Sequence, residues 1–177
     1  QAGHIIFIKN TGTKYNGGIV LKNNMLLFGT GHTGGANLAN VLPFVLAPNS
    51  NALPATNGTR PIIVSPTNGI TLASGNTIRG VEVGYCPNGA KIFGNNFGTL
   101  TVGNTTTPDV ALSGNRTTLD LTNGAFAATS KFAFITSLDT STLILNTVSG
   151  SLASGSTTVN ARDAAKAFDI QNSSAAL

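Results

Sequence analysis

The sequence predicts an all-β protein, a single-stranded parallel β-helix in which each coil stacks on the one before it. Apolar–x–apolar pairs recur along the chain at steps of 19, 19, 18, 19, 19, 19, 24 and 25 residues. Each pair indicates a short strand with one buried face, because successive side chains of a strand point to opposite sides. A near-constant step that is too short for a helical pair is typical of a strand solenoid. The nine pairs are Ile6/Ile8, Met25/Leu27, Phe44/Leu46, Ile62/Val64, Val81/Val83, Leu100/Val102, Leu119/Leu121, Leu143/Leu145 and Phe168/Ile170.

These steps predict about nine coils of mostly 19 residues. Each coil would hold about three short strands joined by bends, with successive coils ~4.8 Å apart. The two final steps are longer, so we expect wider coils or loops there. A helical alternative fails, because i, i+3, i+4, i+7 patterning is absent and β-branched residues are dense.

A second, looser ladder lies between the primary pairs, where another strand of each coil is expected. Gly-Asn dipeptides at 75–76, 94–95 and 114–115 each precede a primary pair. Gly and Asn accept left-handed backbone angles, so the recurring dipeptide predicts a recurring corner. The pairs of the second ladder are Ile19/Leu21, Ile70/Leu72, Val110/Leu112 and Phe132/Phe134.

Residues 47–60 break the rhythm. They contain two prolines and several turn-forming residues, so we expect a loop that projects from the third coil. The 177 residues fit a single domain, 1–177, that can bury a core. The chain starts and stops on the pattern without an evident cap, and open solenoid ends expose unpaired strands. We therefore expect a segment of a longer protein.

Composition excludes several classes of function. Only 9% of residues are charged, against ~25% in a typical soluble domain. The net charge is +4, but the basic residues form no run, so we expect no nucleic-acid partner. One cysteine, Cys86, excludes a disulfide framework and a cysteine-rich metal site, and the two histidines have no metal-ligand spacing. We expect no metal, no cofactor and, without ~18 consecutive apolar residues, no transmembrane segment.

The residue between the two members of each primary pair is expected to face outward. The first four residues of this outward column are Phe7, Leu26, Val45 and Ile63, all of them apolar. A stacked apolar patch normally indicates a contact. Two alternatives stay open: the chain covers the patch itself, most simply with the 47–60 loop, or the patch is an interface with a partner or a preceding domain.

Several phrases resemble large bacterial surface proteins with right-handed parallel β-helix repeats. They are the residues at 15–22, 27–31, 68–80, 97–102 and 119–124, of which NGITLASGNTIRG at 68–80 is the most specific. The resemblance spans nearly the whole chain. It implies a right-handed β-helix from the passenger or stalk region of an autotransported adhesin, extracellular and anchored to the outer membrane through a region outside this chain. It transfers no catalytic residue.

Parallel β-helices also host enzymes that cleave polysaccharides, so the acidic residues matter. Glu82 and Asp120 share the outward column two coils apart, which implies ~9.6 Å between them. That is near the upper end of the ~6.5–9.5 Å that an inverting glycosidase uses. However, Thr101 lies between them and no aromatic platform flanks them. We therefore assign no catalytic residue, and keep this pair as the candidates for catalysis.

The sequence thus predicts a non-enzymatic, surface-exposed scaffold or adhesin passenger segment. Its partner would be a glycan or protein of a host cell or a bacterial surface, in addition to the remainder of its own chain. One alternative is a polysaccharide-degrading glycoside hydrolase or lyase that uses Glu82 and Asp120. Another is a self-association or docking module that uses the apolar column.

Overall fold

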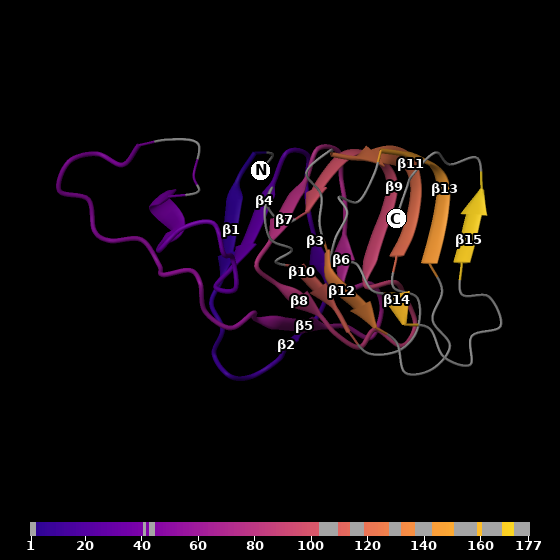
Figure 1. The fold of residues 1–177 in the computed structure, drawn as a ribbon, viewed down its shortest axis with the longest axis horizontal. Helices are drawn as coiled ribbons and strands as arrows, with labels where there is room; N and C mark the ends of the chain where they lie inside the picture. Colours follow the sequence, from indigo (N-terminus) through magenta and orange to yellow (C-terminus); the bar gives the residue numbers. More distant parts are fainter. Residues whose placement is uncertain are drawn as a thin grey trace.

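The chain folds as a solenoid of parallel β-strands with about five coils (Figure 1). The computed structural model describes residues 3–40, 42, 45–102, 110–113, 119–127, 132–136, 143–150, 159–160 and 168–171. Within these residues there is no α-helix, and the only helical turn is the 3-10 helix η1 (Leu38–Asn40). The predicted all-β parallel solenoid is confirmed.

Two sheets carry the strands. In the six-stranded sheet the spatial order is β14 (Val159–Asn160), β12 (Phe132–Thr136), β10 (Val110–Leu112), β8 (Glu82–Val83), β5 (Ile62–Val64) and β2 (Tyr15–Asn16). In the nine-stranded sheet the spatial order is β1 (Ile5–Ile8), β4 (Leu26–Gly29), β7 (Thr77–Arg79), β9 (Ile92–Val102), β11 (Leu119–Phe126), β13 (Leu143–Ser149) and β15 (Phe168–Gln171). Two short strands of the same sheet lie off this path: β3 (Ile19–Val20) pairs with β6 (Ile70–Thr71), and β6 pairs with β9.

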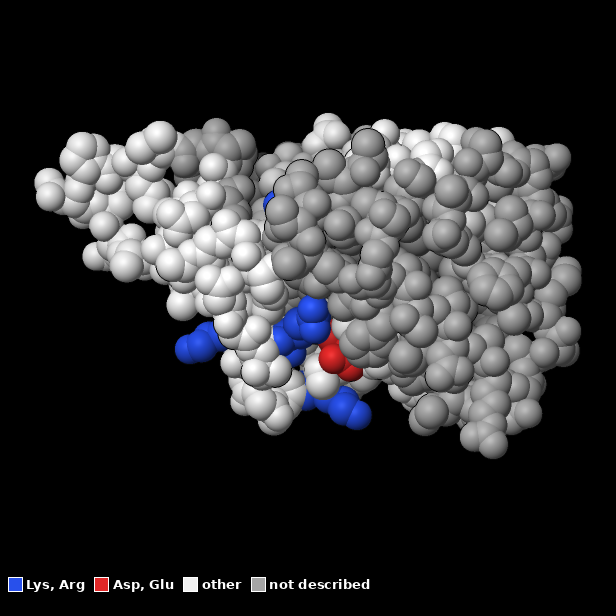
Figure 2. Space-filling model, viewed as in Figure 1, with Lys and Arg blue, Asp and Glu red and all other residues white. Residues whose placement is uncertain are grey.

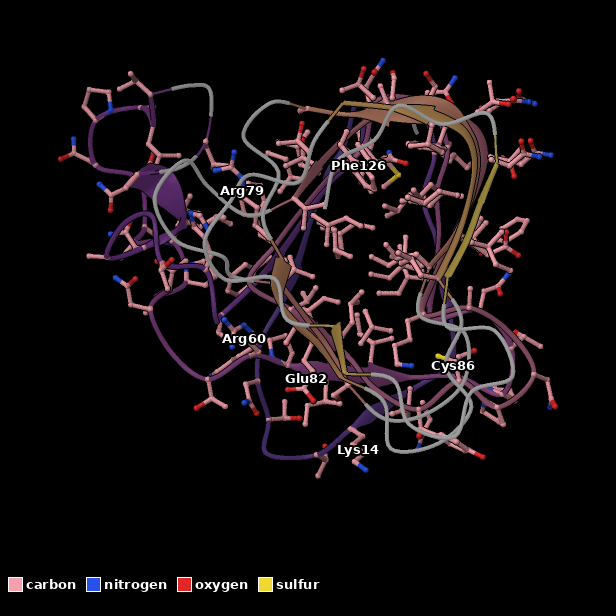
Figure 3. The ribbon with its side chains drawn as sticks, turned by 45° about the vertical axis from the view of Figure 1, so that its right-hand side comes forward. Lys14, Arg60, Arg79, Glu82, Cys86 and Phe126 are labelled. Carbon is pink, nitrogen blue, oxygen red and sulfur yellow. The ribbon has the colours of Figure 1, made fainter. Side chains whose placement is uncertain are left out.

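The core fills the inside of the coils. Side chains from both sheets point inward and meet there (Figure 3). Ile63 of β5, Ile78 of β7, Val83 of β8 and Ile92 of β9 are all fully buried in one cluster. Because each coil stacks its apolar residues on those of the next, the core continues along the solenoid axis.

The strand registers correct the predicted 19-residue step. Ile6 pairs with Leu27 and not with Met25, and Ile62 pairs with Glu82 and not with Val81. Three strands and three corners per coil take more than 19 residues in most coils. The predicted ladder therefore passed from one sheet to the other along the chain, and nine coils were predicted where about five exist.

The C-terminal part of the predicted ladder is correct. Leu119 pairs with Leu143, and Leu143 pairs with Phe168, as the two longer steps predicted. In the second ladder, Ile19 pairs with Ile70. These strands stay in one sheet, so the spacing of their apolar residues equals the length of a coil.

One corner of the solenoid is built from residues with left-handed backbone angles. Asn24, Gly75, Asn96, Asn123 and Thr147 have φ of 58°, 73°, 55°, 52° and 54°. The Asn123 side-chain amide donates to the Asn96 side-chain oxygen over 3.1 Å, which links one coil to the next. Non-glycine residues rarely adopt this conformation, and Asn is among those that tolerate it best.

The predicted Gly-Asn corner is correct at residues 75–76. The Asn76 side chain is only 1% exposed, and its amide donates to the carbonyl oxygens of Lys22 (2.8 Å) and Met25 (3.3 Å). By contrast, Gly94 lies inside β9 without a left-handed angle, so the prediction was wrong there. Residues 114–115 lie outside the described residues.

An insertion at residues 30–61 leaves the coil between β4 and β5 and extends past β1 (Figure 1). Its base is closed by backbone hydrogen bonds, from the Gly58 amide to the Thr30 carbonyl (2.8 Å) and from the Asn57 amide to the His32 carbonyl (2.7 Å). The insertion thus begins and ends at one corner of the second coil.

The predicted third coil at Phe44/Leu46 is not formed. Leu46 lies in the insertion and belongs to no strand, while Phe44 lies outside the described residues. The apolar pair matched the ladder by spacing alone, since no neighbouring strand pairs with it among the described residues.

Candidate functional site

The two carboxylates proposed for catalysis lie on different sheets. Glu82 belongs to β8 of the six-stranded sheet, where it pairs with Ile62. Asp120 belongs to β11 of the nine-stranded sheet, where it pairs with Phe93 and Ile144. They therefore do not stack in one column two coils apart, and the separation predicted from that stacking does not apply.

Glu82 is held by its neighbours. The Ser113 hydroxyl donates to the Glu82 carboxylate over 2.6 Å. Lys14 and Arg60 lie on the same side of the solenoid as Glu82 (Figure 3), and Figure 2 shows basic side chains next to acidic atoms on the face that it draws. A carboxylate with a hydroxyl donor contributes to a polar surface, and the described residues place no second acid beside it.

Asp120 has a different environment, at the edge of a pocket of about 370 Å³. Burial raises the pKa of its carboxyl. Within the described part of the chain, this carboxylate makes no hydrogen bond or ion pair. Its register partner Phe93 also lines the pocket. The expectation that no aromatic ring flanks the acid was wrong, because it assumed a coil of 19 residues and so placed Thr101 beside Asp120, where the structure has Phe93.

The predicted apolar column is not assembled as one surface. Ile63 is 0% exposed and part of the core, because the pairing of Ile62 with Glu82 turns Ile63 inward. A shift of one residue exchanges the two faces of a strand. Val45 lies in the insertion, away from the coils, and is 96% exposed.

The outer face of β1 and β4 is partly covered by the chain itself. Phe7 and Leu26 are half-buried, and Phe7 pairs with Phe28 of the next coil. Phe28 is buried although its neighbour Leu27 points into the core. The His32 ring, at the base of the insertion, packs edge-on against Phe28 with ring centroids 5.6 Å apart. His32 thus covers Phe28, while both alternatives for Phe7 and Leu26, a cover by the chain or an interface with a partner, stay open.

The loop between β8 and β9, residues 84–91, is fixed by hydrogen bonds. Hydrogen bonds tie it to the preceding coil: the Asn88 amide donates to the Pro66 carbonyl (3.2 Å), and the Ala90 amide donates to the Asn68 side-chain oxygen (2.9 Å). A Cβ atom at Gly89 would lie 2.5 Å from that same oxygen. The loop is therefore packed closely against its neighbour and has a defined shape.

The loop itself contains a buried lysine and the single cysteine. Lys91 is 0% exposed, and burial lowers its pKa to about 8. Cys86 is also buried; desolvation raises the pKa of its thiol, and backbone hydrogen bonds and the Lys91 charge partly oppose this. Neither side chain reaches solvent, so we assign them a structural role in supporting the loop.

Two surface pockets flank the loop and share Pro87. One, of about 200 Å³, includes Tyr85, whose side chain is 45% exposed. The other is the pocket of Phe93 and Asp120. Sequence reasoning missed this site, since neither aromatic residue belongs to a ladder pair. The signal available was the loop composition at 85–89, which includes Pro, Asn and Gly between two strands.

Two further observations concern the described residues only. No group of three or more His, Cys, Asp or Glu side chains lies close enough together there to hold a metal ion. The same part of the chain contains no helix with the length and apolarity needed to cross a membrane.

Comparisons with known proteins found no match among protein-family models, curated proteins or solved structures. The solenoid itself is established by the strand registers. The resemblance to autotransported adhesins stays a prediction, as do the partners and the location that it implies.

Proposed function

We propose that this chain is a non-enzymatic β-helical scaffold, an adhesin-like segment displayed outside a bacterial cell, which presents binding surfaces on loops. The observation that supports this most is the contrast between the stacked coils and the projecting insertion at residues 30–61 (Figure 1). A rigid framework with one long exposed loop is a common way to position a contact surface.

The chemistry of the insertion fits a contact role. Its base is fixed by backbone hydrogen bonds, and Val45 is almost fully exposed beyond that base. An apolar side chain that a folded protein holds out in water contributes most when a partner buries it. The separation of Glu82 from Asp120 removes the arrangement that favoured the polysaccharide-degrading alternative.

Adhesion to a surface coated with the purified chain tests the proposal. Bacteria and cultured host cells are applied to wells that carry the native chain or a variant in which residues 45–53 are replaced by a Gly/Ser segment of equal length. We expect cells to adhere to the native chain and most of that adhesion to be lost with the variant. A scrambled sequence of 45–53 serves as the matched control for composition.

The same preparation is incubated with polysaccharides, and released reducing ends are measured. We expect no release. Release that is abolished by Glu82→Gln or Asp120→Asn would overturn the scaffold proposal in favour of an enzyme. Absence of adhesion by the native chain to every cell type would contradict the adhesin role.

A further inference from the structure

Two pockets lie beside loop 84–91. They share Pro87, and together they include Tyr85 on one side and Phe93 with Asp120 on the other. Their volumes of about 200 and 370 Å³ are together typical of a site for a small or medium-sized ligand. We call this feature the Pro87 groove, defined by Tyr85, Pro87, Phe93, Asn68 and Asp120.

The walls of the Pro87 groove are preformed. Tyr85 is anchored through its carbonyl, which accepts a hydrogen bond from the Ser65 amide (3.3 Å). The Asn68 side-chain oxygen accepts from the Ala90 amide, and the Ala90 carbonyl accepts from the Gly69 amide (3.0 Å). A ligand would therefore meet a surface that needs little reordering, which lowers the entropic cost of binding.

Its side chains combine apolar rings with hydrogen-bonding groups. Tyr85 is nearly half exposed and Phe93 is partly exposed, so both can offer ring surface to a ligand. Asp120 lies beside Phe93 in the adjacent coil and brings a carboxylate that has no hydrogen bond within the described residues. Asn68 and Asn88 add amides at the edge.

The charge of the groove restricts the class of ligand. Among the described residues, no Lys or Arg lines either pocket, and Asp120 is the one charged group there. A phosphate, sulfate or uronic acid would be repelled by this partly buried carboxylate. A purely apolar ligand would leave the carboxylate and amides without hydrogen-bond partners, which is costly. The remaining chemistry is an uncharged molecule rich in hydroxyl groups that also has apolar C–H faces.

We propose that the Pro87 groove binds an uncharged oligosaccharide, with Tyr85 and Phe93 packed against sugar faces and Asp120 and Asn68 hydrogen-bonded to hydroxyl groups. Carboxylates and amides accept and donate the hydrogen bonds that sugar hydroxyls need, and aromatic rings bury their C–H faces. Two pockets that both border Pro87 favour two or more linked sugar units over a monosaccharide. This site is separate from the insertion and does not depend on the role proposed for it.

Titration of the full chain with defined sugars tests the proposal. Probes are β-1,4-glucose, α-1,4-glucose, mannose and N-acetylglucosamine oligomers, with polygalacturonate and heparin as anionic probes; binding is followed by calorimetry and by amide chemical-shift changes. We expect at least one neutral oligomer to bind and to shift the amides of residues 84–93. Binding by the anionic probes alone, or by none of the neutral oligomers, would overturn the proposal.

Variants separate the groove from the rest of the molecule. Tyr85→Ala and Phe93→Ala should each weaken binding by about tenfold or more, and Asp120→Asn should weaken it less. Tyr85→Phe keeps the ring and should retain affinity, which guards against a loss caused by misfolding. Val20→Ser, at an exposed site outside the groove, and the Gly/Ser replacement of 45–53 should leave affinity unchanged. Unchanged affinity in both alanine variants would contradict the assignment.

Discussion

The coils and the insertion at residues 30–61 are stabilised in different ways. In the coils, every strand inside a sheet pairs with the coil before and the coil after it, and side chains such as Ile78 are fully buried. In the insertion, backbone hydrogen bonds close the base, but among the described residues from 42 to 53 hydrogen bonds join only Ser50 to Ala47. Stability therefore resides in the stacked coils, and the outer insertion is free to change with little effect on the fold.

The largest difference between the two regions should appear when buried and exposed side chains are shortened. Ile78→Ala should lower the free energy of unfolding by ~2–5 kcal/mol, because it leaves a cavity between β4 and β9. Val45→Ala should change it by less than ~0.5 kcal/mol. Urea denaturation of both variants measures this, and comparable losses would show that the insertion is part of the core.

The free energy of unfolding should depend on pH through Lys91, a buried basic residue of the coils. The pKa of Lys91 is lowered to about 8 in the folded chain from an ordinary value of 10.5, so between these pH values the unfolded chain binds more protons. The free energy of unfolding should then rise with pH over this window, by on the order of 3 kcal/mol.

This rise is measured in a Cys86→Ala background by urea denaturation from pH 7 to 10.5. The background is needed because burial raises the pKa of the Cys86 thiol above its ordinary value of 9.0. The unfolded chain then loses the thiol proton first, so the free energy of unfolding falls as pH rises above 9.0. Adding Lys91→Met should abolish the rise. A rise of equal size in the Met variant would mean that another group causes it.

A buried side-chain amide that joins two coils should be worth more than an exposed side-chain amide of the insertion. Asn76→Ala removes a buried amide that bridges Lys22 and Met25, and it should cost ~1–3 kcal/mol. Asn51→Ala, at an exposed position of the insertion, is the matched control and should have almost no effect. Thermal unfolding of the two variants compares them directly; equal melting temperatures would contradict the bridging role.

The smallest effect is expected from rebuilding the insertion. Replacement of residues 45–53 by a Gly/Ser segment of equal length should leave the free energy of unfolding within ~0.5 kcal/mol of the native value, because the loop length and the base are kept. Denaturant titration measures the change. A loss of several kcal/mol would show that these residues pack against the coils.

The fold was predictable because its signals are local. Apolar alternation marks a strand without knowledge of its partner, and Gly75 marks a corner through its backbone freedom alone. The register was not predictable, because it depends on how many residues each corner takes. Ile63 shows the consequence, since an offset of one residue placed it in the core and not on the surface.

The candidate site was only half visible in the sequence. Asp120 was singled out as an outward acid, which its partly exposed position in β11 supports. Its pairing with Phe93 and the place of Tyr85 across Pro87 arise from the stacking of coils. Residues that meet only through register carry no spacing signal of their own.

Amide hydrogen exchange of the native chain tests most directly the claim that stacked coils hold the fold while the insertion stands apart. Amides bonded between coils, such as those of Ile70 and Leu72, should exchange only through global unfolding. Amides of residues 45–53 should exchange orders of magnitude faster, at nearly the rate of an unstructured peptide. Protection of residues 45–53 equal to that of the coil amides would contradict the account.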